Sequence, residues 1–257
     1  MNRRRGLGLI AGLLTVVPLL VSCGNQQSAS TVITVYAASS LTGTFQQLGE
    51  EFEAEHDGVR VQLNFAGSAD LVAQIEQGAD ADVLATADTA TMARLQAADL
   101  LDAPPVVFAS NTLEIAVPLD NPAHITGLAD LTQPGLQLVV CAPEVPCGAA
   151  AERVARAAGV RLRPVSEEQS VGDVLNKVAV GEADAGLVYR TDVLAAGDRV
   201  RGVPFAEADT AVNDYQIATL AGSDQVELAE EFAEFVLGPR GRRTLRSAGF
   251  GAANRGP

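Results

Sequence analysis

Residues Val32 to Phe52 read VITVYAASSLTGTFQQLGEEF, and this stretch decides the fold class. Its first part, Val32 to Ala37, is rich in β-branched residues, which favour a strand. Its second part carries apolar residues at the spacing of one helical face, namely Leu41, Phe45, Leu48 and Phe52. A strand that leads directly into a helix indicates an α/β protein.

The same alternation continues along the chain. Further strands are predicted at 59–65, 82–86, 113–117, 136–141, 185–189 and 215–220. Helices are predicted at 71–78, 89–98 and 149–158, around 174–178 and 228–236, and after Pro239. The pattern predicts an α/β architecture with largely parallel sheets. We expect two lobes, formed by residues 32–108 with 216–257 and by residues 109–215. Two crossover segments between the lobes would form a hinge, and the cleft between them is a common place for a small ligand.

The N-terminal residues are typical of a processing signal. A basic cluster at Arg3 to Arg5 precedes an apolar run from Gly6 to Leu20 that is short for a permanent membrane helix. The run ends in Leu20-Val21-Ser22-Cys23, which resembles the lipobox of bacterial lipoproteins. The resemblance implies that residues 1–22 are a signal peptide and that Cys23 carries a lipid. An ordinary secretory signal with an incidental Cys23 is the alternative.

The lipid on Cys23 would hold the protein at the outer face of the cell membrane, with residues 23–31 as anchor and polar tether.

The net charge argues against binding to nucleic acid. The whole chain has 18 basic and 32 acidic residues, a net charge of −14. Without residues 1–22 the balance is 15 basic against 32 acidic residues, or −17. Such a surface repels nucleic acid and favours solubility, and we expect a monomer.

Two further cysteines, Cys141 and Cys147, lie six positions apart. In an oxidising compartment they could form a disulfide. Two buried free thiols are the alternative.

Four predicted strand-to-helix turns have small or hydroxyl residues where the helix begins. They are 38–42 (ASSLT), 66–70 (AGSAD), 145–148 (VPCG) and 169–173 (QSVGD). A helix start has unpaired N–H groups and the positive end of the helix dipole, so several starts at one cleft would bind an anion. Each turn alone is explained by helix capping, and Ser170 with Asp173 is typical of a capping box. A site made only of donors would favour a fully ionised oxyanion over a protonated phosphate.

Several motifs occur in a consistent order from Val32 to Phe250. They are 35–41 (VYAASSL), 65–68 (FAGS), 82–88 (DVLATAD), 143–148 (PEVPCG) and 186–189 (GLVY). Together they resemble the molybdate-binding proteins of bacterial ABC importers. The resemblance implies a type II periplasmic-binding-protein fold that captures molybdate, with tungstate as a second ligand, and delivers it to a membrane permease. Molybdenum would be present only as the bound oxyanion, and no cofactor is implied.

The resemblance also implies a ligand shell. Ser40 and Ser68 would offer a hydroxyl and a backbone N–H each, Cys147 and Val171 a backbone N–H, and Tyr189 its phenol. Cys147 departs from the family, in which better-known members have alanine there. A disulfide from Cys147 to Cys141 would make this loop rigid, which is a hypothesis.

Other functions fit the sequence less well. An enzyme is not expected, because His56 and His124 lie near no Gly-x-Ser-x-Gly turn and Cys141 and Cys147 are too far apart for a Cys-x-x-Cys redox site. Ferric iron would require more tyrosines than the three present. Sulfate or thiosulfate is the stronger alternative, because sulfate has the same shape and charge as molybdate. A purely structural envelope lipoprotein, without a ligand, is a further class.

Overall fold

The structure, a computed structural model, describes residues 30–253. The predicted signal peptide, Cys23 and most of the tether therefore lie outside the described residues. Thr31, which we had assigned to the tether, begins the first strand, and its N–H donates to Gly58 O at 2.9 Å.

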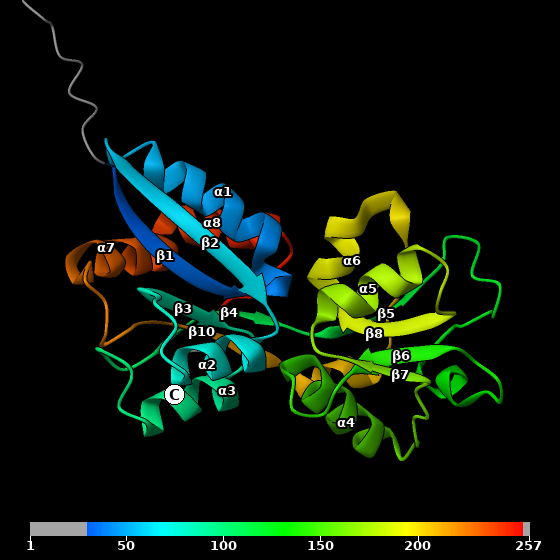
Figure 1. Cartoon of the computed structure of the whole chain (residues 1–257). Helices are drawn as coiled ribbons and strands as arrows, with labels where there is room; N and C mark the ends of the chain where they lie inside the picture. The colour runs from blue at the N-terminus through cyan, green and yellow to red at the C-terminus, as the bar shows by residue number, and fades with distance from the viewer. Residues whose placement is uncertain (1–29, 254–257) are drawn as a thin grey trace, which may run out of the picture.

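Two five-stranded sheets organise the chain into two lobes (Figure 1). The first sheet has the order β2-β1-β3-β10-β4, formed by β1 (Thr31–Ala38), β2 (Val59–Ala66), β3 (Val83–Thr86), β4 (Val106–Asn111) and β10 (Asn213–Thr219). The second has the order β7-β6-β8-β5-β9, formed by β5 (Leu113–Val117), β6 (Leu138–Cys141), β7 (Ser166–Glu168), β8 (Ala185–Tyr189) and β9 (Arg201–Val203). The chain changes sheet at Thr112 and again between Val203 and Asn213.

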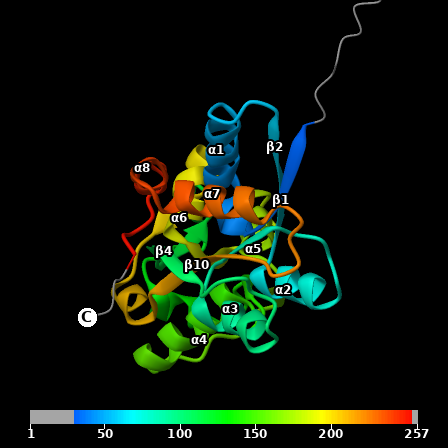
Figure 2. The same ribbon diagram turned by 90° about the vertical axis from the view of Figure 1, so that its left-hand side faces the viewer.

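Helices cover both faces of each sheet because successive side chains of a buried strand point to opposite faces. In the first lobe, α1 (Thr42–Glu53), α7 (Val226–Leu237) and α8 (Pro239–Ser247) lie on one face, and α2 (Ser68–Glu76) and α3 (Thr89–Ala97) lie on the other (Figure 2). In the second lobe, α5 (Val171–Ala179) and α6 (Arg190–Ala196) lie opposite α4 (Pro146–Ala158). Short 3-10 turns η1 (Ser39–Leu41), η2 (Leu128–Thr132), η3 (Gly197–Arg199) and η4 (Ala206–Ala211) complete the described elements.

The packing of the first lobe follows this alternation. Tyr36 and Leu84 pack with α2 and α3 in a small apolar cluster, whereas their neighbours Val35 and Ala85 pack into the main core. On the main-core side, the ring of Phe52 meets Phe232 edge to face at 5.2 Å. The main core continues into the second lobe as one cluster of buried residues, so apolar packing extends across the junction of the lobes.

The expectation of largely parallel sheets was wrong. β1 pairs in parallel with β2 and β3, and β6 with β7 and β8, but β10 and β5 are antiparallel to both of their neighbours. The reason is topological. β1, β3, β6 and β8 run toward the junction between the lobes, whereas β5 and β10 begin there, after the chain has crossed from the other lobe.

Three short strands and one helix were missed by the sequence analysis, namely β4, β7, β9 and α6. β7 and β9 have three residues each. Three residues are too few for the alternation of apolar and polar side chains along a strand to be recognised. The expected helix at 149–158 begins three residues earlier, at Pro146, because proline at a first helical position needs no N–H partner. Cys147 is therefore in the first turn of α4 rather than in a loop.

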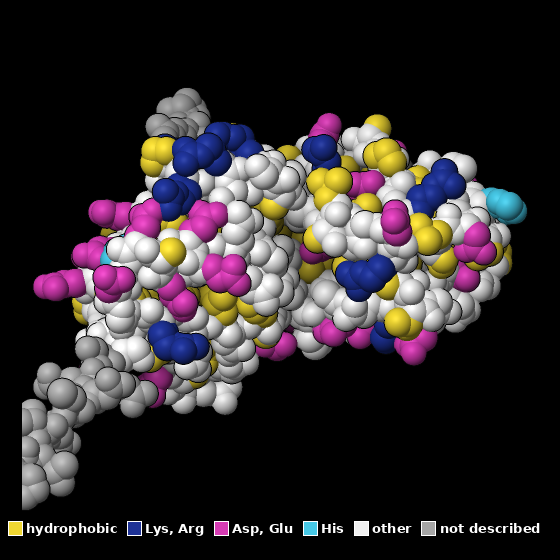
Figure 3. Space-filling model, turned by 90° about the horizontal axis from the view of Figure 1, so that it is seen from above, with side chains coloured by type: hydrophobic (Ala, Val, Ile, Leu, Met, Phe, Trp, Pro, Cys, Tyr) yellow, Lys and Arg dark blue, Asp and Glu magenta, His cyan; other side chains and the backbone are white. Residues whose placement is uncertain are grey.

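The surface agrees with the acidic composition. Acidic side chains lie over both lobes, with basic side chains among them, on the face shown in Figure 3. Within residues 30–253, no helix has the length and the apolar character needed to cross a membrane.

Candidate functional site

Four helix starts meet at one small cavity between the lobes. The space in it that a water-sized probe can occupy is only about 10 Å³, so the closed cavity is too small for an organic ligand of ordinary size. Its lining residues carry no charged side chain, and they are Ala38, Ser39, Ser40, Gly67, Ser68, Ala87, Val145, Pro146, Cys147, Val171 and Tyr189.

All five ligand residues that the resemblance implied line this cavity: Ser40, Ser68, Cys147, Val171 and Tyr189. Four of them are nearly inaccessible from outside, and Ser40 is half-buried. The structure thus brings together residues from both lobes that are far apart in the sequence. Their role as ligands stays a prediction.

The local sequence explains why helices start here. Ser68 is the first residue of α2, Cys147 is the second of α4, Val171 is the first of α5, and Ser40 is in η1, which leads directly into α1. N–H groups in a first helical turn have no partner within their own helix. With the helix dipoles, they make the wall of the cavity electropositive without a cationic side chain.

Four hydroxyl residues line the cavity, Ser39, Ser40, Ser68 and Tyr189, and the last three of them have partners behind the cavity. Ser68 Oγ accepts a hydrogen bond from Ala87 N at 3.0 Å, and the phenol oxygen of Tyr189 accepts one from Asn213 Nδ2 at 2.8 Å. Ser40 Oγ lies 2.9 Å from the hydroxyl of Tyr215, where either atom can be the donor. Burial raises the pKa of both Tyr189 and Tyr215 above the ordinary value. Both phenols therefore remain protonated at neutral pH.

The sequence analysis missed Asn213 and Asn111, and it recognised Tyr215 only as a strand residue. Asn111 Nδ2 donates to Thr191 Oγ1 at 2.8 Å and to the Tyr215 hydroxyl at 3.3 Å. The ring of Tyr215 packs edge to face against Tyr189 at 5.8 Å. The available signal for these residues was the polar character of two strand ends. These are Ser110-Asn111 at the end of β4 and Asn213-Asp214 at the start of β10.

The two cysteines lie next to the cavity. Cys141, at the end of β6, and Cys147 are joined by a bond of 2.04 Å between their Sγ atoms. Both residues are buried. The next residue, Gly148, allows a close approach, because a Cβ atom there would lie 1.9 Å from Ala142 O. This part of the cavity wall is therefore closely packed against the end of β6.

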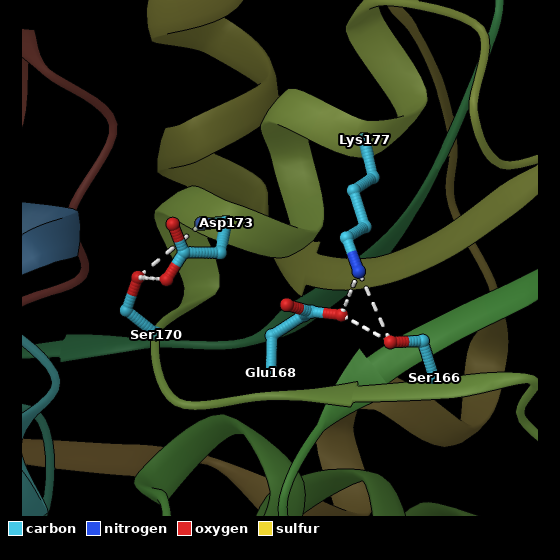
Figure 4. A network of polar contacts seen from close by, with 5 residues as sticks. All are labelled: Ser166, Glu168, Ser170, Asp173 and Lys177. Atoms are coloured by element: carbon cyan, nitrogen blue, oxygen red, sulfur yellow. Dashed lines mark hydrogen bonds and ion pairs between the residues drawn. The ribbon is translucent and has the colours of Figure 1, made fainter.

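The loop from β7 to α5 is held by two polar groups (Figure 4). Lys177 Nζ donates to Ser166 Oγ at 3.0 Å and contacts Glu168 Oε1. Although partial burial opposes it, these hydrogen bonds from Lys177 and Ser166 lower the pKa of Glu168. Ser170 Oγ donates to Asp173 Oδ2 at 2.7 Å and accepts from Asp173 N at 3.2 Å, so Ser170 is the N-cap that its sequence predicts. Val171 lines the cavity, whereas Ser170 does not.

The lobes are closed on each other in this structure. A Cβ atom at Gly67, in the first lobe, would lie 2.0 Å from Gln169 O, in the second. The backbone of Gly67 has φ −61° and ψ 139°, which any residue can adopt. Glycine is therefore needed here for the approach of the lobes rather than for its backbone freedom.

A buried carboxyl lies beside the cavity. Asp192 Oδ2 accepts a hydrogen bond from Tyr189 N at 2.9 Å, and the side chain is almost fully buried. Burial raises the pKa of Asp192 to about 7, against the lowering effect of that hydrogen bond. Elsewhere in residues 30–253, no group of histidine, cysteine or carboxylate side chains has the arrangement of a metal site.

Comparison with known proteins gives consistent results. A model of the family described as bacterial extracellular solute-binding protein matches residues 33–251. The chain is 48% identical to the molybdate-binding protein ModA of Mycobacterium tuberculosis, covering 96% of this chain and 98% of the relative. The periplasmic molybdate-binding protein of Azotobacter vinelandii has a similar fold, with a TM-score of 0.73 at 22% identity over 85% of this chain and 98% of that one. The sulfate-binding protein SubI of Mycobacterium tuberculosis is also similar in fold, with a TM-score of 0.71 at 21% identity over 88% of each chain.

Substitution of Gly67 by alanine should keep the lobes apart, because the added methyl group would overlap Gln169 O. We expect a larger radius of gyration for Gly67→Ala than for the unsubstituted protein when both are measured by small-angle X-ray scattering with molybdate added. Gly43→Ala is the control, since a Cβ atom at Gly43 meets nothing within 4 Å. Equal radii for Gly67→Ala and the unsubstituted protein would show that the contact does not limit closure.

Asp192 should make stability depend on pH. An aspartate has a pKa of about 3.9 in an unfolded chain, whereas that of Asp192 in the fold is about 7. Between these values the folded state binds a proton that the unfolded state lacks. The contribution of Asp192 to the free energy of unfolding therefore falls as pH rises from about 4 to 7, by an amount of the order of 4 kcal/mol, and does not change above that range.

Asp192→Asn removes this contribution. Urea unfolding at pH 5 and pH 8 should show the variant gaining stability relative to the unsubstituted protein at the higher pH. Asp198→Asn, at an exposed position just after α6, is the control and should show no such gain. A stability difference between Asp192→Asn and the unsubstituted protein that is the same at both pH values would contradict the prediction.

Proposed function

Because the chain belongs to the family of bacterial extracellular solute-binding proteins, we propose that it captures molybdate outside the cell and delivers it to the permease of an ABC importer. Tungstate, an oxyanion of the same shape and charge, is the second ligand we propose. The 48% identity to a molybdate-binding protein over nearly the whole chain supports this assignment.

One observation carries the proposal: four helix starts and four hydroxyl residues converge on a cavity whose lining has no charged side chain. Such a wall offers hydrogen-bond donors at many angles, as a tetrahedral oxyanion requires. The overall negative charge is no obstacle, because exposed charges beyond about 8 Å are largely screened at physiological salt. Neither His56 nor His124 lines the cavity.

In this proposal, Ser40 and Ser68 bind the anion through hydroxyl and backbone N–H, Cys147 and Val171 through backbone N–H, and Tyr189 through its phenol. The anion enters when the two lobes are apart. Closure brings Gly67 against Gln169 and completes the shell. The closed form is favoured only by the difference in affinity between the two states. The closed form then docks on the permease.

The location is also part of the proposal. Cleavage before Cys23 and lipidation of its thiol would leave the protein at the outer face of the membrane, beside its permease. Two acyl chains are needed for stable anchoring of this kind. The protein would work there as a monomer.

Sulfate is the alternative to molybdate as the ligand, since a sulfate-binding protein has a similar fold. Sulfate and molybdate share shape and charge, so cavity size rather than the pattern of hydrogen bonds would separate them.

Titration with four anions tests the proposal. Molybdate and tungstate should raise the melting temperature more than sulfate, and phosphate should have the least effect, because a protonated phosphate sets a hydrogen against a donor. If none of the four raised it, the oxyanion function would be wrong. If sulfate had the largest effect, sulfate would replace molybdate as the proposed ligand.

Loss of a hydroxyl should weaken binding. Ser40→Ala and Ser68→Ala should each reduce molybdate affinity by about 1–3 kcal/mol in calorimetric titration, because a buried donor to a charged ligand is lost. Ser247→Ala, at an exposed position at the end of α8 and outside the cavity, is the control. Unchanged affinity in both cavity variants would remove the two serines from the shell.

The bond between Cys141 and Cys147 should support the same wall. Replacement of both cysteines by alanine keeps the backbone N–H at position 147 but frees the start of α4. We expect the double variant to be less stable by about 2 kcal/mol and to bind molybdate less tightly. Equal affinities would show that the bond has no part in binding.

A further inference from the structure

Asn213 connects three segments that form the cavity, although it does not line the cavity itself. It is the first residue of β10 and is 2% exposed. Its Nδ2 lies 3.0 Å from Ala87 O, 3.3 Å from Pro146 O and 2.8 Å from the hydroxyl of Tyr189. Its Oδ1 accepts a hydrogen bond from an NH2 group of Arg153 at 2.7 Å.

These partners determine which way the Asn213 amide faces. The carbonyl oxygens of Ala87 and Pro146 can only accept, and the guanidinium of Arg153 can only donate. A flipped amide would place its oxygen against two carbonyl oxygens and its nitrogen against a cation. The atom that faces Tyr189 is therefore an N–H donor.

The direction of this bond has a consequence for Tyr189. Its phenol oxygen accepts from Asn213, so its own hydrogen must be donated elsewhere. One group within reach is the hydroxyl of Tyr215, and the other direction is the cavity, which Tyr189 lines. An oxyanion in the cavity is a much stronger acceptor than a second phenol. The Tyr189 hydrogen is thus available to the ligand.

The peptide unit at Ala87 extends the network to a second hydroxyl. Its carbonyl oxygen accepts from Asn213 Nδ2, while its N–H donates to Ser68 Oγ at 3.0 Å. Ser68 Oγ, like the Tyr189 oxygen, is thereby occupied as an acceptor and keeps its hydrogen for the cavity. Hydrogen bonds linked in this way polarise one another in the same direction.

We propose that Asn213 is a positioning residue, held by Arg153, that makes Tyr189 and, through Ala87, Ser68 donors toward the bound oxyanion. This inference rests on the proposed function. It assigns Asn213 no direct contact with the anion. Arg153 is the charged end of the network. The site therefore has a cation bonded to Asn213, although Arg153 does not line the cavity itself.

A double-mutant cycle tests whether Asn213 acts through Tyr189. Sodium molybdate is titrated by calorimetry into the full chain and into the variants Asn213→Ala, Tyr189→Phe and their combination. We expect each single substitution to weaken binding about tenfold. The combined variant should be weaker than Tyr189→Phe by no more than about threefold, because the hydroxyl that Asn213 positions is already absent. Independent effects, about a hundredfold in the combined variant, would overturn the inference.

Asn121→Ala is the matched control. Asn121 is also buried, and its side chain bonds only the backbone of Ile125, at 2.9 and 3.0 Å, among the bonds described. It should lower the melting temperature of the free protein without changing molybdate affinity. If Asn121→Ala weakened binding as much as Asn213→Ala does, the effect would be a general loss of structure and the inference would be wrong.

Asn213→Asp provides a second measurement that does not depend on the alanine variant being folded. A carboxylate at position 213 can still pair with Arg153, but it would accept the Tyr189 hydrogen instead of donating to the oxygen. Molybdate binding should weaken more than the tenfold expected of Asn213→Ala; binding equal to that of the unsubstituted protein would overturn the inference. If the unsubstituted protein bound none of the tetrahedral oxyanions, both the proposed function and this inference would fail.

Discussion

The unpaired N–H groups at the start of a helix are the constraint on which the rest of this structure depends. A buried helix start without partners is costly, because each N–H removed from water needs an acceptor. Here α2, α4, α5 and the turn that leads into α1 all begin at the same small cavity. The fold therefore concentrates donors at one place, where the proposed anion would satisfy them. In that proposal, binding and the architecture of the helices have the same physical origin.

The topology of the sheets produces this convergence. The strands that precede the four helix starts end at the junction between the lobes, whereas β5 and β10 begin there. Ligands of open α/β sheets bind outside the carboxyl ends of the strands. In this protein two such sheets face each other, so the carboxyl ends of both contribute. The antiparallel strands add side chains from the crossover segments, Tyr215 and Asn213 among them.

Buried polar residues join the lobes, in addition to apolar packing. Tyr215 is fully buried, contacts the rings of Phe108 and Tyr189, and bonds to Ser40 and Asn111. A buried polar network of this kind is favourable only when its members are all satisfied. The closed arrangement satisfies them, and the approach of Gly67 to Gln169 leaves no room for a side chain between the lobes. Closure and the orientation of the hydroxyls are therefore parts of one arrangement.

The sequence alone determined the fold class, most of the strands and helices, and the set of residues expected at the site. Periodicity indicates which residues face a core, and the strand-to-helix turns carry recognisable small and hydroxyl residues. The shell at Ser40, Ser68, Cys147, Val171 and Tyr189 came from a resemblance across the whole chain, since each turn taken alone is explained by helix capping.

Only the tertiary structure decided which strands are antiparallel, that α4 already begins at Pro146, and that Asn213 and Tyr215 stand behind the cavity. The physical reason is that local pattern records burial and period but not partners. Whether a buried asparagine donates to a tyrosine or to a loop depends on residues brought together from positions 87, 146, 153 and 189, and such contacts exist only after the chain has folded.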